Sequence, residues 1–147
     1  MSQTKAQLIA ADATFTISSD ATINSITVGK GANSVQGNTA LGEDALDGSV
    51  TGINNTAVGS NALTTNTSGQ RGVAVGVSAL RLNTTGTDNV AVGVSALDSN
   101  TTGSQNTALG RFTLGVNTTA SNNTAVGYFA LSANTTGVDN TAVGSGA

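Results

Sequence analysis

The chain repeats one pattern of apolar and polar positions every 17 residues. The segments NTALG, NTAVG, GVAVG, NVAVG, NTALG, NTAVG and NTAVG end, without insertion or deletion, at Gly42, Gly59, Gly76, Gly93, Gly110, Gly127 and Gly144. With Asn38 as position one, the consensus is N-T-A-V-G-x-x-A-L-x-x-N-T-T-G-x-x, and the seventh copy is incomplete at Ala147. So strict a phase indicates stacked copies, because one extra residue would displace every later layer.

Each copy is predicted to form one coil of a β-solenoid. Large apolar residues recur only at positions four and nine, which is too sparse for a helical stripe, and Asn, Thr and Gly are poor helix formers. Thr-Ala-Val alternates as a strand does, and the following Gly turns the chain. A second short extended piece is expected around ALxxNTT. We therefore predict an all-β, parallel β-solenoid with equivalent positions about 4.8 Å apart.

Three columns of identical or similar residues should run along the solenoid. Position four gives an unbroken aliphatic ladder from Leu41 to Val143, which is predicted to fill the core together with the leucines of position nine. Position twelve is predicted to form an amide ladder at a corner. The members of these last two columns are Leu46, Leu63, Leu80, Leu97, Leu114 and Leu131, and Asn66, Asn83, Asn100, Asn117 and Asn134.

Two regions are predicted, a capping and attachment segment at residues 1–37 and the repeat array at 38–147. Thr4 to Ala11 could form a short helix, and ATFTI and INSITVG read as strands. ITVG ends at Gly29, 13 residues before Gly42, so it is interpreted as a shortened first coil that caps the array. No polar cap is evident at the C-terminal end. Either more protein follows there, or another surface covers that end.

The composition argues against several classes of function. The chain has no His, Cys, Pro or Trp, and its two lysines, Lys5 and Lys30, precede the repeats. A Ser or Thr nucleophile therefore lacks a neighbouring base, and we expect neither an enzyme nor a cofactor. The net charge of −3 disfavours nucleic acid as a partner. No apolar run is long enough for a membrane span or a secretory signal, so no membrane insertion is expected.

The carboxylates are not predicted to hold a metal. Glu43, Asp44 and Asp47 of the first copy could in principle perform acid–base chemistry or bind Ca²⁺, but a solvated rim is the favoured interpretation. Asp88, Asp98 and Asp139 lie in different copies and form no ligand set.

Positions six and seven vary most, and they carry the candidate site. Arg111 and Phe112 occupy them in the fifth copy, and Tyr128 and Phe129 in the sixth, so three of the four aromatic residues fall on adjacent coils. Phe112 and Phe129 are expected to stack, with Arg111 and Tyr128 beside them. The favoured interpretation is an aromatic ladder that packs a trimer or closes a wide corner. The alternative is an exposed patch that binds a sugar or a partner protein.

The thin core predicts self-association. Each coil offers only two large aliphatic side chains, so a second buried face would add stability. Small, uncharged Ala and Thr residues at positions two, three and eight suit close packing between chains. We expect a homotrimer around a threefold axis.

The repeats resemble those of two kinds of fibrous protein. NTAVGxxAL, and NVAVGVSAL at Asn89 to Leu97, is similar to the head repeat of trimeric autotransporter adhesins, which forms a left-handed parallel β-roll in a trimer. The whole unit resembles repeats in fibre-like proteins of tailed phages, particularly marine ones. MSQTKAQLI followed by SITVGKGANSVQGNTALG resembles the opening of such phage proteins. The resemblance covers roughly Ile26 to Ala147.

The resemblance implies a structural virion appendage: a phage tail fibre, spike or capsid-decoration fibre assembled in the host cytoplasm. Its N-terminal segment would attach to a capsid or tail protein, and its repeats would project and could contact a host-surface glycan or protein. The alternative is the head of a bacterial adhesin on the outer surface. The chain departs from that family in its period and in lacking a signal peptide and coiled-coil stalk. A remote alternative is ice binding, suggested by the column Thr67, Thr84, Thr101, Thr118 and Thr135.

Overall fold

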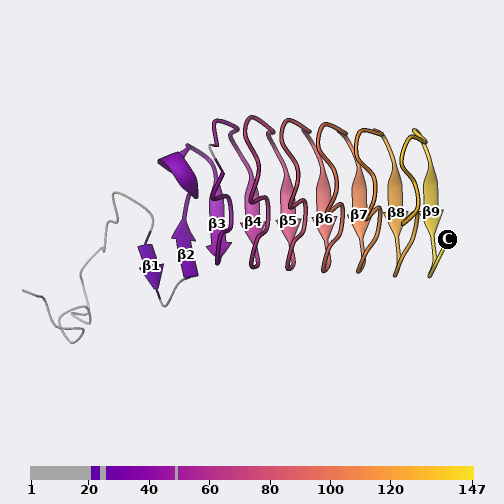
Figure 1. Ribbon diagram of the computed structural model, residues 1–147, viewed down its shortest axis with the longest axis horizontal. Coiled ribbons are helices and arrows are strands. Elements are labelled where there is room, and N and C mark those ends of the chain that lie inside the picture. The colour runs from indigo at the N-terminus through magenta and orange to yellow at the C-terminus, as the bar shows by residue number, and fades with distance from the viewer. Residues whose placement is uncertain (1–20, 24–25, 49) are drawn as a thin grey trace, which may run out of the picture.

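The structure, a computed structural model, is one nine-stranded sheet wound into a solenoid (Figure 1). It describes residues 21–23, 26–48 and 50–147, so the helix predicted at Thr4 to Ala11 and the strand ATFTI lie outside the described residues. The strands are paired in chain order. They are β1 (Ala21–Ile23), β2 (Ile26–Gly29), β3 (Thr39–Gly42), β4 (Thr56–Val58), β5 (Val73–Val75), β6 (Val90–Val92), β7 (Thr107–Leu109), β8 (Thr124–Val126) and β9 (Thr141–Val143).

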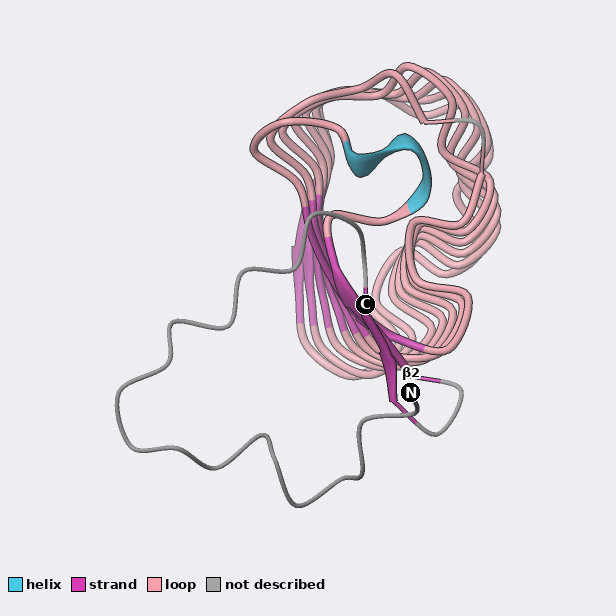
Figure 2. Cartoon of the chain, turned by 90° about the vertical axis from the view of Figure 1, so that its left-hand side faces the viewer, coloured by secondary structure: helices cyan, strands magenta, loops and turns pink. Residues whose placement is uncertain are grey.

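Strands β3 to β9 are parallel, and each pairs with the next in the register that the repeat predicts. Thr39 lies opposite Thr56, Ala40 opposite Ala57 and Leu41 opposite Val58, a displacement of 17 residues. The same displacement holds through β8 and β9. Viewed along the axis, the coils follow almost the same outline (Figure 2). The predicted all-β parallel solenoid with one coil per repeat is confirmed.

Each coil contains one strand, so the prediction of a second extended piece at ALxxNTT was wrong. Positions seven and nine take left-handed backbone angles, with φ of 54° at Ser95 and 51° at Leu97 in the fourth copy. The chain folds into successive turns there, in which Ala96 N–H donates to Gly93 C=O and Asn100 N–H to Leu97 C=O. Residues with positive φ interrupt an extended strand.

The core is built from leucine and alanine. The leucines of position nine are buried as predicted, from Leu46 to Leu114, and the alanines of positions three and eight lie beside them. The predicted inward ladder at position four was wrong, because Leu41 is 45% exposed and Val92 is 38% exposed. Adjacent residues of a strand point to opposite faces, so with position three inside, positions two and four must face outward. The alanines are therefore used within the coil and not between chains.

Two ladders of asparagine run inside the solenoid. At position twelve, Asn83 donates to Asn66 over 3.1 Å, and Asn100 to Asn83 over 2.9 Å, which confirms the predicted amide ladder. The sequence interpretation missed a second ladder at position one, where a side-chain oxygen accepts the backbone N–H of the residue one coil later, as from Asn106 to Asn89. These contacts satisfy buried polar groups and fix the coil spacing.

The N-terminal end of the array is capped by an antiparallel hairpin rather than by a shortened parallel coil. β2 pairs antiparallel with β3, with Val28 opposite Leu41. The connection between them is shorter than the dozen or more residues that a parallel crossover needs. It carries a short 3-10 helix, Ala32–Ser34, that lies across the coil outline in Figure 2. Ala32 and Val35 pack on the core, and Ala32 N–H donates to Leu46 C=O.

Candidate functional site

Four side chains gather at the corner that follows β7 and β8, as predicted. The ring centroids of Phe112 and Phe129 lie 5.0 Å apart with the planes inclined by 38°, so the rings are tilted rather than parallel. Tyr128 meets Phe129 edge-on, with centroids 4.5 Å apart. The guanidinium carbon of Arg111 lies 4.3 Å from the Phe112 ring centre, within cation–π range. Tyr128 is 49% exposed and Phe129 36%, so solvent reaches the cluster.

The two phenylalanines occupy a left-handed backbone position. The φ angle is 58° at Phe112 and 56° at Phe129, and position seven has the same conformation in the preceding copies. Those copies carry Asp44, Asn61, Ser78 and Ser95 there. Asp and Asn tolerate positive φ, whereas bulky residues rarely adopt it. Buried leucines at position nine also have positive φ, but the half-exposed phenylalanines have less burial to offset the strain.

A cavity of about 230 Å³ lies beside the two phenylalanine rings. It spans the fourth, fifth and sixth copies, and its lining combines apolar and polar groups. The lining residues are Phe112, Phe129, Val116, Gly115, Ser95, Ser99, Ser132 and Asp98. The sequence interpretation found only the two phenylalanines. The available signal was that positions seven, ten and eleven of neighbouring coils stack into adjacent columns.

The fifth copy departs from the consensus directly beneath this cavity. Gly115 is the only glycine at position ten, and Thr113 replaces the alanine found at position eight in the other copies. Thr113 is buried, and its hydroxyl donates to Gly127 C=O in the next coil. A Cβ added at Gly115 would meet only the Phe112 backbone, at 3.2 Å from its carbonyl oxygen. The absence of a side chain at Gly115 therefore keeps the cavity open.

An ion pair orients the carboxylate of the cavity. Arg81, one coil earlier, donates from Nε to Asp98 Oδ1 over 2.8 Å and from Nη2 to Oδ2 over 3.0 Å. The hydrogen bond to Asp98 raises the pKa of Arg81. This two-pronged contact holds the Asp98 carboxylate in one orientation, and each of its oxygens keeps a lone pair for another donor.

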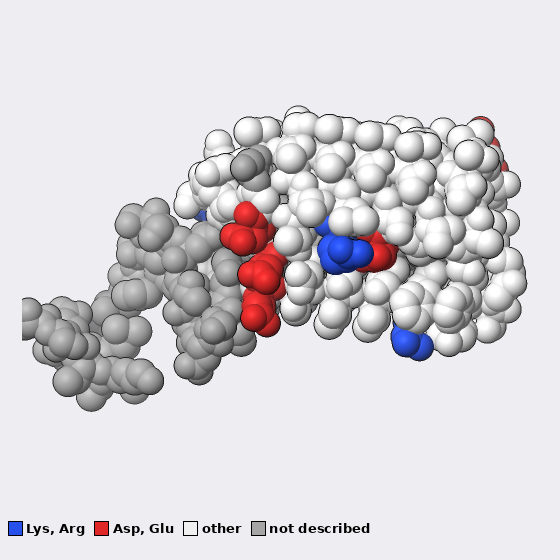
Figure 3. Space-filling model, in the orientation of Figure 1, with Lys and Arg blue, Asp and Glu red and all other residues white. Residues whose placement is uncertain are grey.

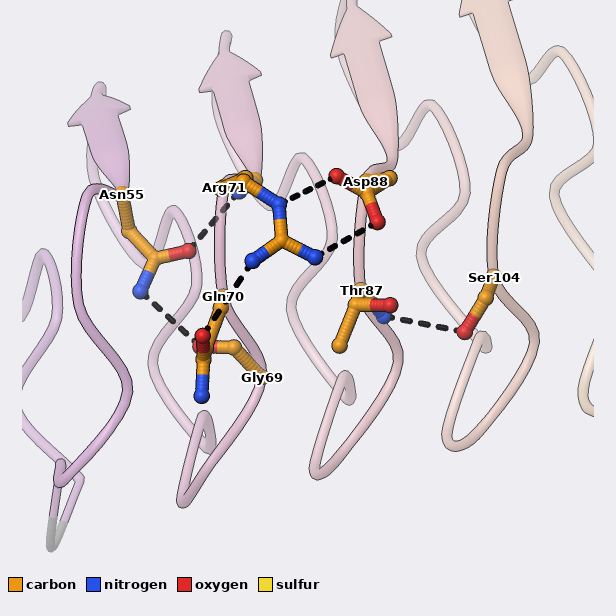
Figure 4. A network of polar contacts seen from close by, with 8 residues as sticks. Asn55, Gly69, Gln70, Arg71, Thr87, Asp88 and Ser104 are labelled. Carbon is orange, nitrogen blue, oxygen red and sulfur yellow. Dashed lines mark hydrogen bonds and ion pairs between the residues drawn. The ribbon is translucent and has the colours of Figure 1, made fainter.

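A second pair of the same kind lies on the surface at position seventeen. Arg71 donates from Nε to Asp88 Oδ1 over 2.6 Å and from Nη2 to Oδ2 over 2.8 Å (Figure 4). The hydrogen bond from Arg71 lowers the pKa of Asp88 below its ordinary value of 3.8. The pair is exposed and bridges two coils.

The carboxylates of the first copy, Glu43, Asp44 and Asp47, are all exposed. Acidic side chains gather over the first coil near β3, and most of the remaining surface in this view carries no charge (Figure 3). Within residues 21–23, 26–48 and 50–147, no three acidic side chains come together as a metal site would require.

A second candidate surface is the outer sheet face, which we define as the side chains at positions two and four of β3 to β9. Every one of them is Thr, Val or Leu, and Leu109 is 37% exposed. The face consists of Thr39, Leu41, Thr56, Val58, Val73, Val75, Val90, Val92, Thr107, Leu109, Thr124, Val126, Thr141 and Val143. It is an uncharged, largely apolar surface that runs along the parallel part of the sheet.

The comparisons with known proteins do not assign a family. No family model matches the chain, and neither the curated proteins nor the solved structures compared with it gave a match. In the part of the chain that the structure describes, no helix is long and apolar enough to cross a membrane.

Proposed function

We propose that the chain is a non-enzymatic structural protein whose solenoid forms the stiff shaft of a virion appendage. In this proposal the shaft is a homotrimer, and the outer sheet face forms the contact between protomers. The observation that carries the proposal is the outer sheet face itself. It presents apolar residues such as Leu41, Val92 and Leu109 to solvent.

The outer sheet face has the properties of an association surface. Seven strands in register extend it over about 29 Å, at about 4.8 Å a strand. A continuous apolar surface of this extent is rare on a monomer and usually marks an interaction site. The charged residues of the repeats, including both ion pairs, lie at other positions of the coil. A second copy of the same face is the partner that matches a flat surface without charge.

The ladders within the solenoid support a mechanical role. Backbone hydrogen bonds, two asparagine ladders and two ion pairs all connect one coil to the next along the axis. Bonds in that direction resist bending and stretching of a shaft. The number of protomers and the virion location come from the resemblance of the repeats, and the N-terminal segment would join the shaft to the particle.

The association is tested by sedimentation equilibrium of the purified chain. We expect the mass of a trimer, and Val92→Lys should shift it toward the monomer because a charge at the centre of an apolar contact is poorly compensated. Thr102→Lys is the matched control, since Thr102 is exposed at position fourteen, away from the outer sheet face. Its mass should remain that of the trimer. A monomeric wild-type chain at every concentration would contradict the proposal.

The location is tested by labelling the chain and imaging intact particles by electron microscopy. Label on fibres or spikes of a virion supports the proposal. Label on the outer surface of bacterial cells would instead support the adhesin-head alternative.

Ice binding is not proposed as a second function. The hydroxyls of Thr67, Thr84 and Thr101 donate to carbonyl oxygens one coil later over 2.8, 2.9 and 3.0 Å. Their protons are therefore used inside the solenoid. Thermal hysteresis of the purified chain would revive this alternative.

A further inference from the structure

We propose that the cavity beside Phe112 and Phe129 binds the pyranose ring of a glycan. The first argument is the unusual placement of the two rings. Both occupy a left-handed position that earlier copies fill with Asp, Asn or Ser, and Phe129 remains 36% exposed. A strained, incompletely buried aromatic pair is consistent with a binding role, because packing alone does not require it.

The lining of the cavity matches a ligand that has one apolar face and many hydroxyl groups. Phe112 and Phe129 provide aromatic surface, whose electron-rich faces attract the polarised C–H groups of a sugar ring. Ser95, Ser99 and Ser132 contribute hydroxyls, which both donate and accept hydrogen bonds. The polar groups would fix the orientation of a ring that packs on the aromatic surface.

The Asp98 carboxylate is prepared to accept hydroxyl protons. Arg81 holds both of its oxygens, and the side chain is 21% exposed at the cavity. A carboxylate oriented before binding loses little freedom when a ligand arrives. Two vicinal hydroxyls of a pyranose could donate to its remaining lone pairs.

The charges around the cavity disfavour other ligands. A cation would have to compete with Arg81 for Asp98 and would meet Arg111 over the Phe112 ring. An anion would face the Asp98 carboxylate. A purely apolar ligand would leave the carboxylate and the serines without partners, which costs free energy.

The size of the cavity limits the ligand to one sugar unit. Its volume of about 230 Å³ lies below the roughly 300–1,000 Å³ typical of sites for larger ligands. A single ring contributes few contacts, so each site is expected to bind weakly. Parallel sites on associated shafts would strengthen attachment through multivalency.

The test is a titration of the full chain with methyl glycosides of glucose, galactose and mannose, followed by saturation-transfer and amide-shift NMR. We expect saturation transfer to at least one glycoside and shift changes at Ser99, Phe112 and Gly115. Gly115→Thr and Phe129→Ser should each weaken binding at least about tenfold. The chain carries Thr64 and Ser95 at the equivalent positions, so both variants are expected to fold. Val77→Ser, exposed at position six of the third copy, should bind as the wild type does.

Three results would overturn the proposal. The first is no response to any of the glycosides up to about 100 mM, well above the affinity expected for so small a ligand. The second is unchanged binding in both cavity variants. The third is a cluster whose shifts respond to protein dilution and not to glycoside, which would make it a contact between protomers. The inference rests on the proposed function only because a projecting shaft would present the cavity. A trimer without glycoside binding and a glycoside-binding monomer are distinguishable outcomes.

Discussion

At the scale of the residue, the coil depends on positions where few side chains are tolerated. Gly93 has a φ of 138°, and a Cβ there would lie 2.4 Å from Gly110 C=O in the next coil. The invariant glycine of the repeat is therefore needed both for its conformation and for the close approach of two backbones. The sequence pattern identified this glycine as a turn, but the close approach follows from the stacking.

The ladder at position one has a gap at Gly72, which predicts a stabilising substitution. In Gly72→Asn the new side chain should accept the N–H of Asn89 and donate to Gly86 C=O, as Asn106 does in its own copy. We expect the free energy of unfolding to rise by about 1 kcal/mol, from reduced freedom of the unfolded chain and from added hydrogen bonds. Urea denaturation followed by circular dichroism measures it.

Gly72→Ala is the control for that substitution. It reduces the freedom of the unfolded chain but adds no hydrogen bond, so its gain should be smaller than that of Gly72→Asn. If Gly72→Asn is no more stable than Gly72→Ala, the ladder does not contribute in the way we infer.

At the scale of the element, each coil is one strand followed by a series of turns, held to its neighbours by side chains as well as by the sheet. The pattern predicted the strand correctly from Thr-Ala-Val. It failed at ALxxNTT because left-handed angles at Leu97 and its equivalents are stabilised by burial, which local sequence does not reveal. It also missed the ion pairs, although Arg71 and Asp88 are separated by one period.

The pair of Arg71 and Asp88 predicts a local pH dependence. The pKa of Asp88 in the folded chain lies below its ordinary value of 3.8 because Arg71 donates to the carboxylate. Its stabilising contribution is therefore present above the unfolded pKa and is lost as the pH falls through the folded pKa. The contribution is small because the pair is exposed. Carboxyl ¹³C NMR of Asp88 should show the lowered pKa.

Arg71→Gln tests the cause of that shift. Without the guanidinium, the pKa of Asp88 should move back toward 3.8. An Asp88 titration that does not change in this variant would mean that another group lowers the pKa.

At the scale of the whole molecule, the solenoid is nearly one-dimensional, and each coil contacts mainly its neighbours. The hairpin β1–β2 and the 3-10 helix at Ala32–Ser34 cover the N-terminal end, where Ala32 packs on the core beside Leu46. In such a structure, local damage is expected to spread from one end by loss of successive coils.

Ala32→Asp tests this behaviour by placing a carboxylate against the core. We expect the first coil to lose about 2 kcal/mol, because the carboxylate is brought near apolar groups. Hydrogen exchange should quicken at Leu46 and remain slow at Leu97 and Leu114. Uniformly faster exchange along the chain would indicate a single cooperative unit instead. Gln36→Asp, exposed in the same connection, is the control.

The sequence by itself determined the 17-residue period, the parallel register, the leucine column and the amide ladder, because strict repetition permits only stacking in phase. It also brought Arg111, Phe112, Tyr128 and Phe129 together by their equivalent positions. Only the tertiary structure decided which side of each strand faces inward. Alternation separates position three from positions two and four, but it does not say which of them is inside. The interior beside each leucine holds alanine, so the larger Val and Leu side chains form the outer sheet face. The cavity, too, depends on three coils at once, since its aromatic wall, its oriented carboxylate and Gly115 come from different copies.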